Sequence, residues 1–106
     1  MRVLITGASG FIGRNVLLRA PRDWEIVAVY HETSSLAAFV AQHELAHVRA
    51  VACDLASVDS VTTLVRQTGA VDACLYLAAN GDPAKSSERP VWDLQLNTVA
   101  PVTLLD

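Results

Sequence analysis

The sequence of 106 residues has little of several things, and each shortage excludes a class of protein. Two cysteines are too few for a disulfide-stapled scaffold, so we expect a reducing compartment, the cytoplasm. The eight lysines and arginines stand singly against eleven acids, for a net charge of −3, so we expect neither nucleic acid nor a membrane surface as partner. No apolar run approaches the ~18 residues that a membrane span needs. Hydrophobic residues make up 52%, which excludes a disordered chain.

What the sequence does contain is a regular alternation of short apolar runs and segments of helical period. The alternation predicts an α/β fold in which a parallel sheet is covered on both faces. Right-handed crossovers then give a doubly wound, Rossmann-like sheet of four βα units with strand order 3-2-1-4. The predicted strands are Arg2–Thr6, Glu25–Tyr30, His47–Cys53 and Val71–Ala79. The predicted helices begin in the turn 7–13, at Thr33 or Ser34, after Ser57 and near Val91.

The spacing of apolar residues also predicts which side of each helix is buried. In the first helix we expect a buried side made of Ile12, Val16, Leu17 and Leu18. In the second, Leu36, Phe39 and Val40 follow the i, i+3, i+4 pattern. In the third, which Gly69 should end, we expect one face with Val58, Val61, Leu64 and Val65.

A glycine-rich turn follows the first strand and opens the first helix. It reads Thr6-Gly7-Ala8-Ser9-Gly10-Phe11-Ile12-Gly13, with glycines spaced G-x-x-G-x-x-G. Gly7 permits a tight turn, Gly10 lets the backbone approach a pyrophosphate, and Gly13 lets the helix pack closely. The helix start then offers N–H groups and a positive dipole end to phosphates. The pattern therefore predicts dinucleotide binding, and the alternative is a tight turn without a ligand.

This turn resembles the cofactor turn of the extended short-chain dehydrogenase/reductase superfamily, the NAD(P)-dependent epimerase/dehydratase group. Further similarities follow in order along the chain, although Tyr76 stands where the family often has His. Asp54 and Leu55 resemble the step that meets the adenine. Leu77, Ala78 and Ala79 resemble the strand-four motif under the cofactor, and Ser86, Pro90 and Asn97 fall at the family's spacing. The resemblance implies an oxidoreductase, epimerase or dehydratase that uses NAD or NADP, with a hydroxyl or carbonyl substrate such as a nucleotide-linked sugar.

The end of the second predicted strand bears on the choice of cofactor. NAD sites usually carry an acid there, which accepts hydrogen bonds from the adenosine ribose. Here Tyr30 and His31 occupy the position, and Glu32 follows beyond them. His31, together with Arg14, could supply positive charge for a 2′-phosphate, or both could be ordinary surface residues. The pattern favours NADP over NAD. Asp54 has an alternative role as a turn acid before Ser57.

A second motif competes with the glycine turn. His43-Glu44-Leu45-Ala46-His47 matches H-E-x-x-H, which binds zinc when both histidines lie one turn apart on a helix. Here the motif spans the end of a predicted helix and the entry to a strand, so we expect no metal site and two surface histidines.

The catalytic residues that the resemblance implies are missing from this chain. The superfamily uses a Tyr-x-x-x-Lys pair, but the sequence has one lysine, Lys85, and neither Tyr30 nor Tyr76 opens such a pair. Asn97 is the one catalytic candidate, or else a polar helix residue. We therefore expect residues 1–106 to be the N-terminal part of a single dinucleotide-binding domain, or a non-catalytic binding module. The outer edge of the fourth strand should be open, which favours homo-oligomers or other association through that edge.

Overall fold

The computed structural model describes residues 1–31, 35–78 and 88–105. The chain divides into two compact units. We call Met1–Ala52 with Ala70–Leu77 the sheet unit, and Cys53–Gly69 with Ala78–Asp106 the helical unit. In the part of the chain that is described, no helix has the length and apolar character needed to cross a membrane.

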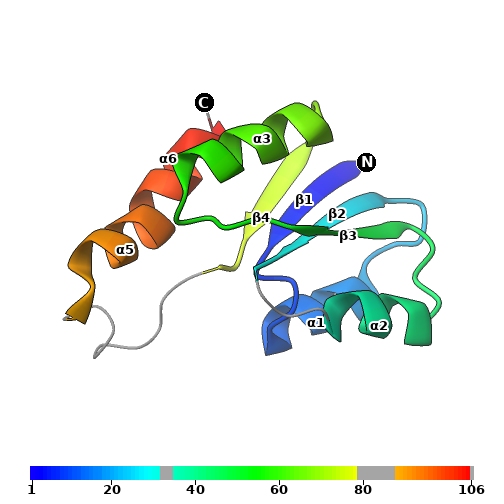
Figure 1. The fold of residues 1–106 in the computed structure, drawn as a ribbon. Helices are drawn as coiled ribbons and strands as arrows, with labels where there is room; N and C mark the ends of the chain where they lie inside the picture. The colour runs from blue at the N-terminus through cyan, green and yellow to red at the C-terminus, as the bar shows by residue number, and fades with distance from the viewer. Residues whose placement is uncertain (32–34, 79–87, 106) are drawn as a thin grey trace. The chain divides into compact units, whose positions relative to one another are not determined.

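The sheet unit is built on four parallel strands: β1 (Arg2–Thr6), β2 (Glu25–Tyr30), β3 (Val48–Ala52) and β4 (Ala73–Tyr76). Their order is β3-β2-β1-β4, which confirms the predicted Rossmann-like sheet (Figure 1). The outer strands β3 and β4 are shorter than the ranges predicted from the sequence. Cys53, which follows β3, and Cys74, in β4, are both free thiols.

Two helices, α1 (Phe11–Arg19) and α2 (Ser35–Gln42), cover one face of this sheet (Figure 1). The core beneath them follows the two-residue period of the strands, in which alternate side chains point to the same face. Leu17 of α1 and Leu36 of α2 are fully buried against this face, with Phe39 and Val40 partly buried beside them, as the pattern in α2 predicted. The strand residues of this core are Val3, Ile5, Ile26, Ala28 and Val48.

The buried side of α1 is narrower than predicted. Leu17 is completely buried, but Ile12 and Leu18 are 63% and 42% exposed, so the expectation for these two residues was wrong. The physical reason is the position of Gly13, which is buried and lies one helical turn before Leu17. These two residues face the sheet, and at 3.6 residues per turn their chain neighbours Ile12 and Leu18 are rotated away from it.

The helical unit contains α3 (Val58–Thr68), α5 (Pro90–Leu94), a π-helical turn η1 (Gln95–Val99) and α6 (Ala100–Leu105). The last three form one helical run, where the sequence predicted a helix from about Val91, and α6 contacts α3 (Figure 1). The predicted ends of α3 are confirmed: the Ser57 hydroxyl accepts a hydrogen bond from the Ser60 N–H at 3.3 Å, and Gly69 follows with a φ of 72°.

The buried face of α3 also differs from the prediction. Val61 and Leu64 are buried as expected, and Thr68 joins them. Val58 and Val65 are 46% and 41% exposed, so their assignment to the buried face was wrong. The stripe follows i, i+3, i+7 along the helix, and Val65 stands about 100° around the axis from Leu64.

We predict that Gly13→Ala destabilises the fold. A Cβ atom at Gly13 would lie 2.5 Å from the Gly7 carbonyl oxygen and 2.6 Å from the Ala8 Cα, and both are backbone atoms that cannot move aside alone. We expect the free energy of unfolding, measured by urea denaturation, to fall by about 1–3 kcal/mol, as for overpacked cores.

Gly10→Ala is the matched control, because a Cβ there would meet the Gly7 oxygen at 3.4 Å, an ordinary contact. Equal stability of the two variants would contradict the close approach of α1 to the turn.

Candidate functional site

The glycine turn lies at the carboxyl end of β1 and is tied to both neighbouring strands. The Ala8 N–H donates to the Val29 carbonyl near the end of β2, at 3.2 Å. The Leu77 N–H, just after β4, donates to the carbonyl and the hydroxyl oxygen of Thr6, each at 3.2 Å. The turn and the ends of β2 and β4 are therefore held together at the edge of the sheet where doubly wound folds bind ligands.

The turn itself has the conformation that its glycines were expected to provide. Gly7 has a φ of 67°, which suits glycine, and its carbonyl accepts a hydrogen bond from the Gly10 N–H at 3.2 Å. Gly13 makes the close approach to Gly7 and Ala8 described above.

The start of α1 has features that suit an anion. Gly10 is the N-cap residue and has no side chain to satisfy the first N–H groups of the helix. The first turn also carries no acidic residue that would offset the positive end of the helix dipole. Ser9 precedes this cap, while Phe11 and Ile12 begin the helix with exposed side chains. The backbone here can therefore face a phosphate group without competition from a capping side chain.

At the end of β2 the structure has Tyr30, half-buried, followed by His31, exposed. No carboxylate occupies either position, and Glu32 lies outside the described residues. Leu77 is half-buried beside the end of β1, in the sheet unit. Ala79 and Ser86, which the resemblance includes, also lie outside the described residues, whereas Ala78 is described and belongs to the helical unit.

Asp54 and Leu55 begin the helical unit. The Asp54 carboxylate accepts a hydrogen bond from the Ala56 N–H at 3.0 Å, so it shapes the turn before α3, as the alternative interpretation proposed. Its own N–H donates to the Ser60 hydroxyl at 3.1 Å, and Leu55 is buried. Burial raises the pKa of the neighbouring Cys53 thiol; its contact with the Ser60 hydroxyl opposes the shift, and the Asp54 charge adds to it. A raised pKa favours the neutral thiol, the less nucleophilic form.

Asn97 lies in the π-helical turn η1 and is exposed. Its side-chain amide donates to the Asp93 carboxylate at 3.0 Å, an interaction within the same helical run. The apolar character of this run gave no indication of a π-turn, a feature that is frequent at functional sites.

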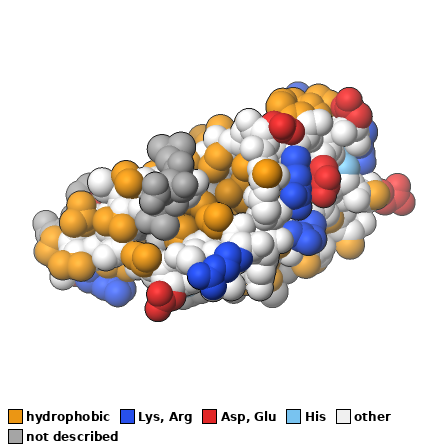
Figure 2. All heavy atoms as spheres, turned by 90° about the horizontal axis from the view of Figure 1, so that it is seen from above, with side chains coloured by type: hydrophobic (Ala, Val, Ile, Leu, Met, Phe, Trp, Pro, Cys, Tyr) orange, Lys and Arg blue, Asp and Glu red, His pale blue; other side chains and the backbone are white. Residues whose placement is uncertain are grey.

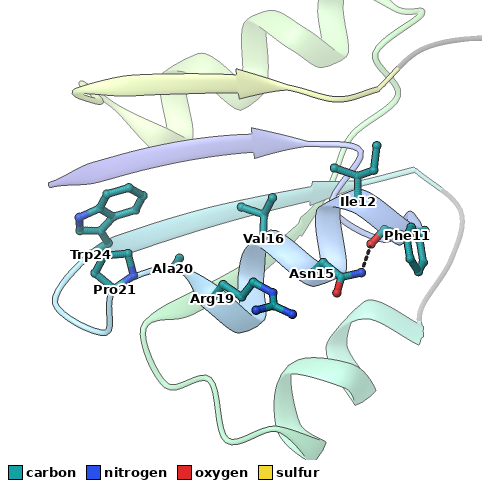
Figure 3. A pocket seen from close by; sticks show the side chains of 8 residues that line it. All are labelled: Phe11, Ile12, Asn15, Val16, Arg19, Ala20, Pro21 and Trp24. Carbon is teal, nitrogen blue, oxygen red and sulfur yellow. Dashed lines mark hydrogen bonds between the residues drawn. The ribbon is translucent and has the colours of Figure 1, made fainter.

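The described residues also form hollows that the sequence did not predict. In the helical unit a hollow of about 650 Å³ is lined by Asp54, Ala56 and residues at the start of α5, where the Arg89 guanidinium stacks 5.3 Å from the centre of the Trp92 ring. In the sheet unit an apolar hollow of about 520 Å³ runs along α1 from Phe11 to Trp24 (Figure 3). Its polar members are Asn15, which donates to the Phe11 carbonyl, and Arg19.

The H-E-x-x-H segment does not form the helix that zinc binding needs. α2 ends at Gln42, and Glu44 has a φ of 54°, outside helical geometry. The His43 ring contacts the Phe39 ring in a tilted arrangement, with the ring centres 4.5 Å apart, while His47 directly precedes β3. Among the described residues, no three His, Cys, Asp or Glu side chains gather as metal ligands would.

Comparison with known proteins agrees with this geometry. The fold and turn define a Rossmann-like dinucleotide-binding architecture. The model of the NAD dependent epimerase/dehydratase family matches residues 3–106, and the chain belongs to this family. Membership implies a nicotinamide dinucleotide as cofactor. No curated protein matches the sequence.

Solved structures share the fold. The UDP-Glc/GlcNAc 4-epimerase of Campylobacter jejuni has a TM-score of 0.77 and 23% identity, over 98% of this chain and 32% of that one. BdcA (YjgI) of E. coli has a TM-score of 0.78 and 24% identity, over 98% of this chain and 53% of that one. Pal of Bacillus thuringiensis has a TM-score of 0.78 and 24% identity, over 99% of this chain and 34% of that one. The chain thus spans between a third and about half of the length of these structures.

We predict that Gly10→Val abolishes dinucleotide binding and leaves most of the fold intact. The Cβ itself is tolerated, but the two added methyl groups would stand at the uncapped start of α1, where a pyrophosphate must approach. The measurement is binding of NADPH and NADH by calorimetry, with circular dichroism to show that the variant is folded. If the folded variant binds as tightly as the wild type, the turn does not hold phosphate.

Proposed function

We propose that this chain is the NAD(P)-binding, N-terminal portion of an oxidoreductase, epimerase or dehydratase. The observation that carries the proposal is the glycine turn, which is bonded to the ends of β2 and β4 and leads into the uncapped start of α1. Such a turn presents backbone N–H groups to a pyrophosphate. The match of the family model over residues 3–106 supports the same conclusion.

Different residues would bind different parts of the dinucleotide. Gly7, Gly10 and the first turn of α1 would hold the pyrophosphate through the backbone. The resemblance further implies that Asp54 and Leu55 contact the adenine, and that Leu77, Ala78 and Ala79 contact the cofactor. When bound, the nicotinamide supplies a hydride acceptor or donor. Asn97 remains the one catalytic candidate in this chain.

We propose NADP rather than NAD as the cofactor. The described end of β2, Tyr30 and His31, has no acid that would accept bonds from a ribose and repel a 2′-phosphate. We propose the cytoplasm as its compartment, which fits the two free cysteines.

For the substrate, we propose a hydroxyl or carbonyl compound of the nucleotide-linked sugar class. A similar fold in a protein described as a UDP-Glc/GlcNAc 4-epimerase supports this class. The alternative is a module that binds NAD(P) without turnover.

The test is calorimetric binding of NADPH and NADH to the 106-residue chain, followed by an assay for oxidation of bound NADPH with sugar nucleotides. We expect NADPH to bind more tightly than NADH. We expect no turnover, because no proton donor of the Tyr-x-x-x-Lys kind stands beside the nicotinamide. Absence of binding by either nucleotide contradicts the proposed function, and turnover by this chain contradicts the assignment of its catalytic residues to another segment.

We further propose that the chain associates with itself through the sheet unit. β4 is an edge strand whose Leu75 is 38% exposed, and Phe11 and Ile12 are 85% and 63% exposed. Figure 2 shows hydrophobic side chains beside single charged ones on one face of the molecule. Open strand edges and exposed apolar side chains both favour pairing.

We therefore predict that sedimentation of the 106-residue chain gives a mass above the 11.4 kDa of one copy. Leu75→Lys should shift the chain toward the monomer, because a charge on an edge strand opposes pairing. Val102→Lys, at an apolar position of α6 that is more exposed than Leu75 (61% against 38%), is the control. A monomeric wild type, or an equal effect of both variants, would exclude association through β4.

A further inference from the structure

Arg14 is held by three residues from two segments of the sheet unit, the glycine turn and α2. Its Nε donates to the Ser9 carbonyl in the glycine turn at 2.8 Å. Its Nη2 donates to the Ser35 hydroxyl, the first residue of α2, also at 2.8 Å. The guanidinium lies 5.2 Å from the centre of the Phe39 ring, a cation–π distance. An arginine side chain normally loses conformational entropy when it binds a ligand. Here the side chain is already ordered in the folded protein, so less entropy is lost on binding.

The anchors place this cation at the carboxyl end of β1 and β2. Ser9 belongs to the turn that follows β1, and Ser35 begins the helix that follows β2. The bond between the Ala8 N–H and the Val29 carbonyl holds that turn to the end of β2. In doubly wound sheets the adenosine ribose lies beyond the end of the second strand. Arg14 therefore borders the region that the 2′ position of a bound nucleotide would occupy.

The charges of the described residues around Arg14 suit a phosphate there. The first turns of α1 and α2 contain no acidic residue, and neither Tyr30 nor His31 is an acid. A guanidinium has five N–H donors, of which the two anchors to Ser9 and Ser35 use two. The Ser35 hydroxyl accepts from Arg14, so its own hydrogen can be donated to a further acceptor.

We propose that Arg14, supported by Ser35, recognises the 2′-phosphate of NADP and determines the cofactor preference. This rests on the proposed dinucleotide-binding function and adds the residues that read the cofactor. A planar, preorganised guanidinium matches a phosphate better than a mobile lysine would.

The experiment compares two ligands that each carry two phosphates, adenosine 2′,5′-bisphosphate and ADP. Only the first has a phosphate on the 2′ position. Calorimetry on the 106-residue chain should show tighter binding of the bisphosphate by the wild type. Arg14→Gln should lower the affinity for the bisphosphate by about tenfold or more, because charge-assisted hydrogen bonds are stronger than neutral ones. It should leave the affinity for ADP unchanged. Arg19→Gln, an exposed arginine in the last turn of the same helix, is the control and should alter neither ligand.

The same comparison separates recognition from a structural role. If Arg14 merely braces the glycine turn, Arg14→Gln weakens both ligands equally, which overturns the inference. Ser35→Ala provides a second variant should Arg14→Gln fail to fold; it should weaken the bisphosphate alone, and an unchanged bisphosphate affinity overturns the inference. A wild type that binds ADP at least as tightly as the bisphosphate overturns the inference and leaves the proposed function standing. A wild type that binds neither contradicts both.

Discussion

The sheet unit depends on one close approach, that of Gly13 in α1 to the backbone of Gly7 and Ala8. With no Cβ at position 13, the helix lies so near the turn that an added Cβ would sit 2.5 Å from the Gly7 oxygen. This approach buries Leu17 one turn later and brings the helix start directly behind the turn. The same contact therefore sets the packing of α1 on the sheet and leaves its first N–H groups at the carboxyl edge, where an anion can reach them. Stability and binding thus share a single residue, which explains why a glycine stands inside a helix despite its poor propensity.

Much of the fold could be predicted because it follows from local patterns. Near-continuous apolar strands alternating with helical segments predict a parallel sheet, and handedness leaves few strand orders. The cap at Ser57 and the end at Gly69 are also local signals and were found where expected. The buried faces of α1 and α3 were predicted less well, because hydrophobic residues such as Ile12 and Val65 were assigned to the core by type alone. Which of two adjacent apolar residues is buried depends on how the helix is rotated, and that rotation is decided by distant contacts.

The functional site, too, could be predicted only in part. The glycine turn could be identified because each glycine answers a backbone requirement that is visible in the spacing. The anchoring of Arg14 could not be, since it requires Ser35 and Phe39, which lie more than twenty positions away in the sequence and come close only when α2 packs beside α1. Likewise, H-E-x-x-H has the right spacing for zinc, but a left-handed residue at Glu44 ends the helix before the second histidine. The spacing of a motif predicts a binding site only where the helix or strand that contains the motif is unbroken.

Backbone hydrogen bonds join the segments at both ends of the parallel strands, and the two ends differ in the side chains that add to these bonds. At the amino edge, charged side chains bind neighbouring segments: the Arg2 N–H donates to the Asp72 carboxylate at 2.7 Å, and the Arg2 guanidinium lies 3.5 Å from the Glu25 carboxylate. At the carboxyl edge, the ties between the turn, β2 and β4 are made by the backbone and by the buried Thr6 hydroxyl. Groups that already pair with opposite charges have little left for a ligand. Since backbone bonds hold the carboxyl edge, its cation and helix start remain for an anion, as expected of a sheet that binds a nucleotide at this end.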